Sequence, residues 1–188
     1  MLKLLVVIVS TRPGRVGLPV GTWFFGHAKQ HARFDVELVD LKELALPFLD
    51  EPKHPRFRTY EHDHTKAWSA TVDAADAFVF VTPEYNFGVP APLVNALDYL
   101  FVEWGYKPAA FVSYGGMSGG VRSVQMAKQL LTTLKVMPLP EAVAIPMVAQ
   151  HLDKATGAFQ PAEPHVKSAS DTLDELHRWA TALKTMRG

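Results

Sequence analysis

The chain has 188 residues, a length typical of one domain, and hydrophobic residues make up 48% of it, which is enough for a sizeable core. Its 19 lysines and arginines balance 19 aspartates and glutamates, so nothing in the charge predicts a nucleic acid or an anionic membrane as partner. The sequence contains no cysteine, which excludes disulfides, iron–sulfur clusters, thiolate metal sites and cysteine nucleophiles. Residues 1–188 are predicted to form a single domain.

Apolar runs typical of buried strands alternate with patterns typical of helices. The predicted strands are residues 2–9, 34–41, 77–82, 108–114 and 141–147. The predicted helices are residues 17–32, 61–75, 91–103, 119–136 and 166–186. This order predicts an α/β fold with a doubly wound sheet of parallel strands, helices on both faces, and ligands bound beyond the carboxyl ends of the strands.

The beginning of the chain is the apolar run LKLLVVIVS, which lacks a small-residue cleavage site and is too short to span a bilayer. We therefore expect a cytoplasmic protein whose first strand begins at once. Residues 44–60, which contain three prolines, and residues 149–164 are predicted to be long surface loops, and the sequence assigns a role to neither.

Polar residues follow the first strand, where Ser10, Thr11 and Arg12 precede the helix expected near Gly17. Free N–H groups and the dipole at a helix start bind phosphate, and two hydroxyls with a guanidinium would complete a dianion site. The alternative is that the hydroxyls only cap the helix and the arginine is solvated. The Walker A and GxGxxG patterns are absent here, so a monophosphate fits better than a nucleoside triphosphate.

The loop after the third strand runs from Pro83 to Pro90 and contains Glu84-Tyr85-Asn86. Its prolines stiffen it, so its N–H and C=O groups can meet the edge of a flat heterocycle while an aromatic side chain supplies a face. A rigid turn, with the amide of Asn86 bonded to its own backbone, is the alternative.

The loop after the fourth strand, SYGGMSGG at 113–120, carries four glycines. Without side chains, its backbone can lie directly against a planar ring, and a loose turn is the alternative. The three loops are predicted to meet at one edge of the sheet, beside the point where a doubly wound fold binds its ligand.

Together, STRPGRVG, PEYNFGVPAPLVNALDYL and KPAAFVSYGGMSGG resemble the NADPH-dependent FMN reductase family of flavodoxin-like proteins, which includes quinone, chromate and azo-dye reductases. The likeness covers roughly residues 3–145. It implies a flavodoxin-like five-stranded sheet of order 2-1-3-4-5, with the FMN phosphate at the first loop, the ribityl chain and ring edge at the second, and the ring face at the third. The cofactor-binding residues that it implies are Ser10, Thr11, Arg12, Val16, Gly17, Leu18, Pro83, Glu84, Tyr85, Asn86, Phe87, Ser113, Gly115, Gly116 and Gly119. Leu18 stands where many relatives have a hydroxyl residue.

The resemblance also implies an activity and an assembly. FMN would accept hydride from NADPH or NADH and pass two electrons to a quinone, an azo dye, a metal oxyanion or free flavin. Because the flavin carries this chemistry, we assign no catalytic acid, base or nucleophile. A homodimer or homotetramer is expected, and Trp104 and Tyr106 are placed either at the site or on a neighbouring subunit.

Other functions remain open on the sequence alone. Gly116-Met117-Ser118-Gly119-Gly120 matches GxSxG, so a serine hydrolase is the main alternative, with Asp153 as its acid and His165 or His177 as its base. That alternative leaves the other two loops unexplained. A non-catalytic flavin redox sensor is the third interpretation.

Histidine pairs occur at helical or near-neighbour spacing, but the sequence favours no metal site. His27 and His31 are one helical turn apart, and His62 and His64 are separated by one residue. Neither pair has an evident third ligand, so solvated or partly buried histidines are expected.

Overall fold

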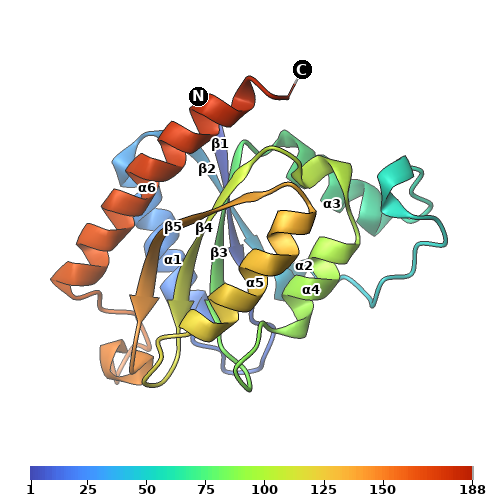
Figure 1. Ribbon diagram of the computed structural model, residues 1–188. Helices are drawn as coiled ribbons and strands as arrows, with labels where there is room; N and C mark the ends of the chain where they lie inside the picture. Colours follow the sequence, from blue (N-terminus) through green and yellow to red (C-terminus); the bar gives the residue numbers. More distant parts are fainter. Residues whose placement is uncertain (188) are drawn as a thin grey trace.

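The computed structural model describes residues 1–187 and contains one five-stranded sheet. All strand pairs are parallel, and the order is β2-β1-β3-β4-β5 (Figure 1). The strands are β1 (Leu2–Ile8), β2 (Phe34–Asp40), β3 (Ala77–Pro83), β4 (Pro108–Tyr114) and β5 (Met137–Ile145). The predicted doubly wound fold and strand order are confirmed.

Helices cover both faces of the sheet (Figure 1). One face packs against α1 (Gly17–His31) and α6 (Glu163–Lys184), and the other against α3 (Asp63–Ala74), α4 (Ala91–Asp98) and α5 (Val121–Thr133). The short helices are α2 (Leu41–Leu44), η1 (Pro55–Phe57), η2 (Val102–Trp104) and η3 (Val148–His151). Within residues 1–187, no helix has both the length and the apolar character needed to cross a membrane.

Strand β3 lies in the middle of the sheet and is buried along its whole length. Its residues alternate between the two cores: Val79 and Val81 face α1 and α6, while Phe78 and Phe80 face α3, α4 and α5. A strand covered on both faces needs apolar residues at every position, which explains the continuous run in the sequence.

Helix α1 approaches the sheet closely through two glycines. A Cβ atom at Gly17 would lie 2.5 Å from Oη of Tyr114, and one at Gly21 would lie 2.5 Å from Cγ1 of Ile8. Side chains at these positions would push the helix away. The glycines therefore set the start of α1 directly against the carboxyl ends of β1 and β4.

The structure moves two predicted boundaries by four residues or more, and others by three or fewer. Strand β5 begins at Met137 rather than at residue 141, although it contains Pro138 and Pro140. It is an edge strand that pairs only with β4, and prolines are tolerated at an edge because half of the backbone groups there need no partner strand. Helix α4 ends at Asp98, not at residue 103, and the next residue, Tyr99, is turned toward the long loop.

Trp104 is fully buried in the core, where its ring lies 5.0 Å from that of Phe78, and its Nε1 donates a hydrogen bond to the carbonyl of Leu97 at 3.3 Å. It therefore neither lines the site nor is available to a neighbouring subunit, and the prediction for this residue is wrong. Its role is packing between η2 and the sheet.

Candidate functional site

The three polar loops meet beyond the carboxyl ends of β1, β3 and β4, at the lower end of the molecule in Figure 1. They enclose a cavity of about 170 Å³. Of the residues predicted from the sequence, the cavity is lined by Ser10, Arg12, Val16, Pro83, Glu84, Tyr85 and Gly115. The sequence reasoning missed Gly14, Arg15, Tyr114 and Val148, which also line it.

Ser10 and Tyr85 connect the first two loops. The Oγ atom of Ser10 lies 2.7 Å from Oη of Tyr85, and the two hydroxyls share a hydrogen bond. Ser10 is buried, whereas Tyr85 has part of its ring in solvent. The bond fixes the tyrosine over the mouth of the cavity and holds the loop after β3 against the loop after β1.

Arg15 is the most informative residue of the first loop. Its side chain is only 7% exposed and pairs through Nη2 with the carboxylate of Asp40, at the end of β2. Its Nε and Nη1 atoms are buried and have no hydrogen-bond partner within residues 1–187. Buried donors without a partner are costly, so the N–H groups of these two nitrogens are suited to bind an anion at this position. Arg12, by contrast, is exposed.

A phosphate group fits this arrangement. Two unpaired N–H groups of one guanidinium can bind two oxygens of a phosphate, and the positive end of α1 begins at Gly17, two residues further along the chain. The residues after β1 are therefore suited to the phosphate of FMN. The signal for this site in the sequence is a second arginine, Arg15, three positions after Arg12.

Residues Tyr85 to Gly88 form a tight turn. The N–H of Tyr85 donates to the carbonyl of Gly88 at 3.1 Å, and the N–H of Gly88 donates back at 2.9 Å. Asn86 and Phe87, in the middle, have φ of 50° and 67°. Two consecutive left-handed residues are typical of a type I′ turn, which asparagine tolerates well and phenylalanine does not. A rigid turn is therefore present, but the Tyr85–Gly88 backbone pair holds it, and within residues 1–187 the Asn86 amide makes no hydrogen bond of the kind expected for the alternative.

Glu84 faces helix α5, where its carboxylate is paired with a cation. Its carboxylate accepts hydrogen bonds from Nε of Arg122 at 2.6 Å and from Oγ of Ser118 at 3.0 Å. Burial disfavours the charged form, but these bonds outweigh burial and lower the pKa of Glu84 below its ordinary value. The carboxylate thus connects the second loop to the third and stays ionised near neutral pH.

The glycine-rich loop after β4 lies beside the end of β5. The N–H of Gly115 donates to Ile145, and the N–H of Met147 donates to the carbonyl of Gly116 at 2.8 Å. Gly119 has φ of 59°, and a Cβ atom there would lie 3.0 Å from the backbone nitrogen of Pro146. At Gly116 the space where a side chain would stand is open. The result is a bare backbone surface beside the cavity, suited to a planar ring.

Tyr114 and Ser113, at the end of β4, lie on opposite faces of the sheet. The ring of Tyr114 is buried beside the cavity, and its hydroxyl has no hydrogen-bond partner in the described part of the chain. Burial and the neighbouring Tyr85 raise the pKa of Tyr114, so it stays a neutral donor. Ser113 is buried near Gly120, away from the cavity.

The remaining predicted residues do not line the cavity. Thr11 faces a second hollow of about 420 Å³ formed with α2 and the start of α4. Leu18 projects into solvent, and Gly17 packs on Tyr114. In total, eight of the predicted cofactor residues do not line the cavity: Thr11, Gly17, Leu18, Asn86, Phe87, Ser113, Gly116 and Gly119.

The residues proposed for a serine hydrolase are not assembled. Ser118 donates to Glu84. Asp153 accepts N–H groups of its own turn, including that of Thr156 at 2.8 Å. Nδ1 of His165 accepts the N–H of Ala162, and the ring of His177 packs on Phe34, at the opposite edge of the sheet. Within residues 1–187 these side chains form no catalytic triad, so the hydrolase alternative is wrong.

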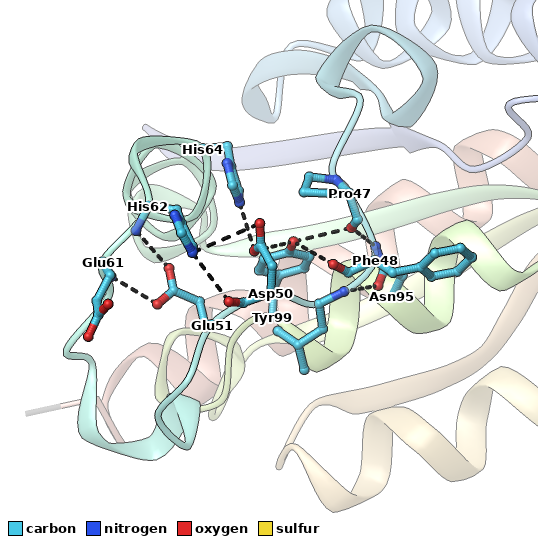
Figure 2. Close-up of polar contacts among 10 residues, drawn as sticks. Pro47, Phe48, Asp50, Glu51, Glu61, His62, His64, Asn95 and Tyr99 are labelled. Carbon is cyan, nitrogen blue, oxygen red and sulfur yellow. Dashed lines mark hydrogen bonds and ion pairs between the residues drawn. The ribbon is translucent and has the colours of Figure 1, made fainter.

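His62 and His64 contact the long loop at 45–62. Their rings stack 5.2 Å apart, and Nε2 of His64 lies 3.0 Å from Oδ1 of Asp50 (Figure 2). The hydroxyl of Tyr99, from the end of α4, donates to the same carboxylate at 2.8 Å. The loop is thereby attached to α3 and α4. Over residues 1–187, no group of three or more possible metal ligands occurs.

Comparisons with known proteins identify the family of the chain. A family model described as NADPH-dependent FMN reductase matches residues 2–150. The chain is 40% identical over 168 residues to an NAD(P)H-dependent FMN reductase of Schizosaccharomyces pombe, covering 88% of this chain and 82% of that protein. It is also 44% identical over 73 residues to a probable NADPH:quinone oxidoreductase of Oryza sativa subsp. japonica, covering 35% and 34% of the two chains.

A solved structure shows the same fold. The flavoenzyme NAD(P)H:(acceptor) oxidoreductase FerB of Paracoccus denitrificans superposes with a TM-score of 0.76 at 20% identity, covering 97% of this chain and 98% of that one. The fold is therefore flavodoxin-like, as predicted. With the family model matching most of the sequence, the chain belongs to the NADPH-dependent FMN reductase family.

Proposed function

We propose that the protein binds FMN in the cavity between the three loops and reduces a quinone with electrons from NADPH. When bound, FMN accepts hydride from the nicotinamide and passes two electrons to the acceptor. The observation that carries this proposal is that Nε and Nη1 of Arg15, beside Ser10 and the start of α1, are buried and have no partner among residues 1–187.

The residues of the cavity supply binding and position. Arg15 and the free N–H groups at the start of α1 hold the phosphate, while Tyr85, fixed by Ser10, lies at the mouth. The backbone at Gly115, which lines the cavity, and at Gly116, which is exposed, leaves room for the isoalloxazine face. Because the ionised carboxylate of Glu84 is paired with Arg122 and bonded by Ser118, we assign it no proton transfer, and its role is to join two loops.

Phe87 supports the choice of a planar acceptor. Its ring is 69% exposed, and its left-handed backbone costs roughly 1–2 kcal/mol relative to an ordinary conformation. The guanidinium of Arg122 lies 3.8 Å from the ring centroid and returns only about 0.5–1 kcal/mol at an exposed site. Strain that packing does not offset is typical of functional positions. We assign this ring to stacking on the quinone or the nicotinamide.

We also propose a cytoplasmic homodimer or homotetramer. The support is Phe48, which is 85% exposed at the rim of the hollow next to Thr11. Apolar side chains on both sides of that hollow, including Leu46 and Pro92, would be covered by a second copy. Light scattering of the purified protein, with Phe48→Asp as the variant expected to shift the mass downward, tests this assignment.

The function is tested by purification and spectroscopy. We expect flavin absorption bands, release of FMN on denaturation, and oxidation of NADPH that depends on a soluble naphthoquinone. Parallel assays with NADH, an azo dye, chromate and free FMN rank the donors and acceptors by kcat/KM. Protein that stays colourless with added FMN and gains no thermal stability from it would contradict the proposal.

A further inference from the structure

A third cavity, of about 550 Å³, lies at the amino ends of the strands, at the opposite end of the sheet from the flavin site. It is formed where the chain enters β3, β4 and β5 and where α6 ends, near the chain termini at the upper end of Figure 1. Its volume is in the range of small-molecule sites. None of the flavin loops contributes to it.

The carboxylates at this cavity already have partners. Asp76 accepts from Arg187 at 2.8 Å and from Lys184 at 3.2 Å. Glu103, which is fully buried, accepts from Tyr60 at 2.8 Å, and further bonds reach it from Ser69 and Arg58. Asp73 pairs with the same Arg58. A cationic ligand would have to compete with these bonds.

The cationic side chains, in contrast, have N–H groups to spare. Lys107 is 3% exposed, and its Nζ donates to the carbonyls of Val72 and Asp73, which uses two of three N–H groups. Nε of Arg187 is buried without a partner in the described chain. Lys135 and Lys184 add positive charge at the mouth. The donors left over favour an anion.

Most of the remaining wall is apolar. Phe101, Val102, Leu134 and Met186 line the cavity, and Val102 is 49% exposed at its rim. An inorganic anion would leave this surface uncovered. An aromatic or aliphatic body attached to the anionic group would fill the volume and bury the apolar wall.

We propose that this cavity is a second ligand site, which binds an organic carboxylate or sulfonate with its anionic group at Lys107 and Arg187 and its apolar body against Phe101 and Val102. The site is separate from the flavin site, so both sites can be occupied at the same time. This assignment does not depend on the identity of the electron acceptor.

The test uses FMN-saturated protein and isothermal titration with 2-naphthoate at neutral pH. We expect one binding site with a submillimolar Kd, and binding at least about tenfold weaker for the neutral analogue 2-naphthamide, because the charge-assisted bonds are lost. Lys107→Met should weaken 2-naphthoate by a similar factor.

Lys107 also caps the end of α3, so its substitution can disturb the fold. Val102→Glu avoids this, because it only places a carboxylate at the exposed rim, and it too should weaken 2-naphthoate about tenfold. Val166→Glu, at an exposed valine of α6, is the matched control and should leave Kd within about twofold. Equal affinity for acid and amide, no binding at millimolar concentration, or no effect of Val102→Glu would each overturn the assignment.

Discussion

The hydroxyl of Tyr85 lies 2.7 Å from that of Ser10, so a single hydrogen bond joins residues that are 75 positions apart in the sequence. One partner is buried and the other is partly in solvent. Such a bond contributes about 0.5–1.5 kcal/mol, which is modest for the fold but decisive for where the ring of Tyr85 lies.

Tyr85→Phe should lower the free energy of unfolding by about 0.5–1.5 kcal/mol. Ser10→Ala should do the same. The double variant should lose little more stability than either single variant, because both substitutions remove the same hydrogen bond. Urea denaturation of the four proteins measures this coupling. Strict additivity of the two losses would show that the hydroxyls act independently.

Arg15→Met should weaken FMN by about 10- to 150-fold, equivalent to the 1.5–3 kcal/mol of a charge-assisted bond, and should weaken riboflavin far less. Arg12→Met should have the smaller effect, because Arg12 is exposed. Fluorescence titration of apoprotein with both flavins gives the dissociation constants.

The substitution at Arg15 also leaves the carboxylate of Asp40 without its partner. Arg15→Met with Asp40→Asn corrects for that loss, and the double variant should still discriminate less between FMN and riboflavin. If both variants lose affinity for FMN and for riboflavin by the same factor, Arg15 supports the fold and does not bind phosphate.

Much of the architecture was predictable because β1 and β3 are continuous apolar runs, and such runs occur in strands covered on both faces. The sequence predicts a start of β5 that is four residues too late. Pro138 and Pro140 disfavour a strand unless it is known to lie at the edge of the sheet.

The site was predictable loop by loop but not atom by atom. The sequence places Glu84 beside Tyr85, yet only the fold shows that its carboxylate turns toward Arg122. Likewise, the burial of Arg15 depends on Asp40, which arrives from another strand. Contacts between distant segments of this kind leave no periodic signal in one sequence.

Glu84→Gln should reduce stability at neutral pH and have less effect in acid. The pKa of Glu84 is lowered in the folded protein, so its contribution is complete above the ordinary value of 4.5 and is lost as pH falls through the folded-state pKa. Urea midpoints at pH 7 and in acid measure this. The pH profile of NADPH oxidation with saturating FMN should be unchanged, and loss of one limb in the variant would reveal a catalytic acid.

Phe87→Gly separates strain from function. Glycine relieves a left-handed φ of 67°, and this relief only partly compensates in the other direction for the lost contact with Arg122 and for the greater freedom of glycine in the unfolded chain, so the free energy of unfolding should change by no more than about 1 kcal/mol. Turnover with a quinone should fall, because the stacking surface is gone. Phe87→Tyr is the control that keeps the ring. Full activity of the glycine variant would show that the aromatic side chain has no role in the reaction.

Burial lowers the pKa of Lys107 to about 8 from its ordinary value of 10.5, although Asp73, Asp76 and Glu103 lie nearby and oppose the shift, while Arg187 adds to it. Between these two values the unfolded chain binds more protons than the folded one, so this residue makes stability rise with pH, by on the order of 3 kcal/mol over the whole window. Below pH 8 the penalty is present in full. Denaturant unfolding of wild type and Lys107→Met from pH 7 to 10 should therefore show a slope in the wild type that the variant lacks. The comparison cancels the contribution of tyrosine titration, which is the same in both proteins. Parallel curves would mean that the ammonium is better solvated than its 3% exposure indicates.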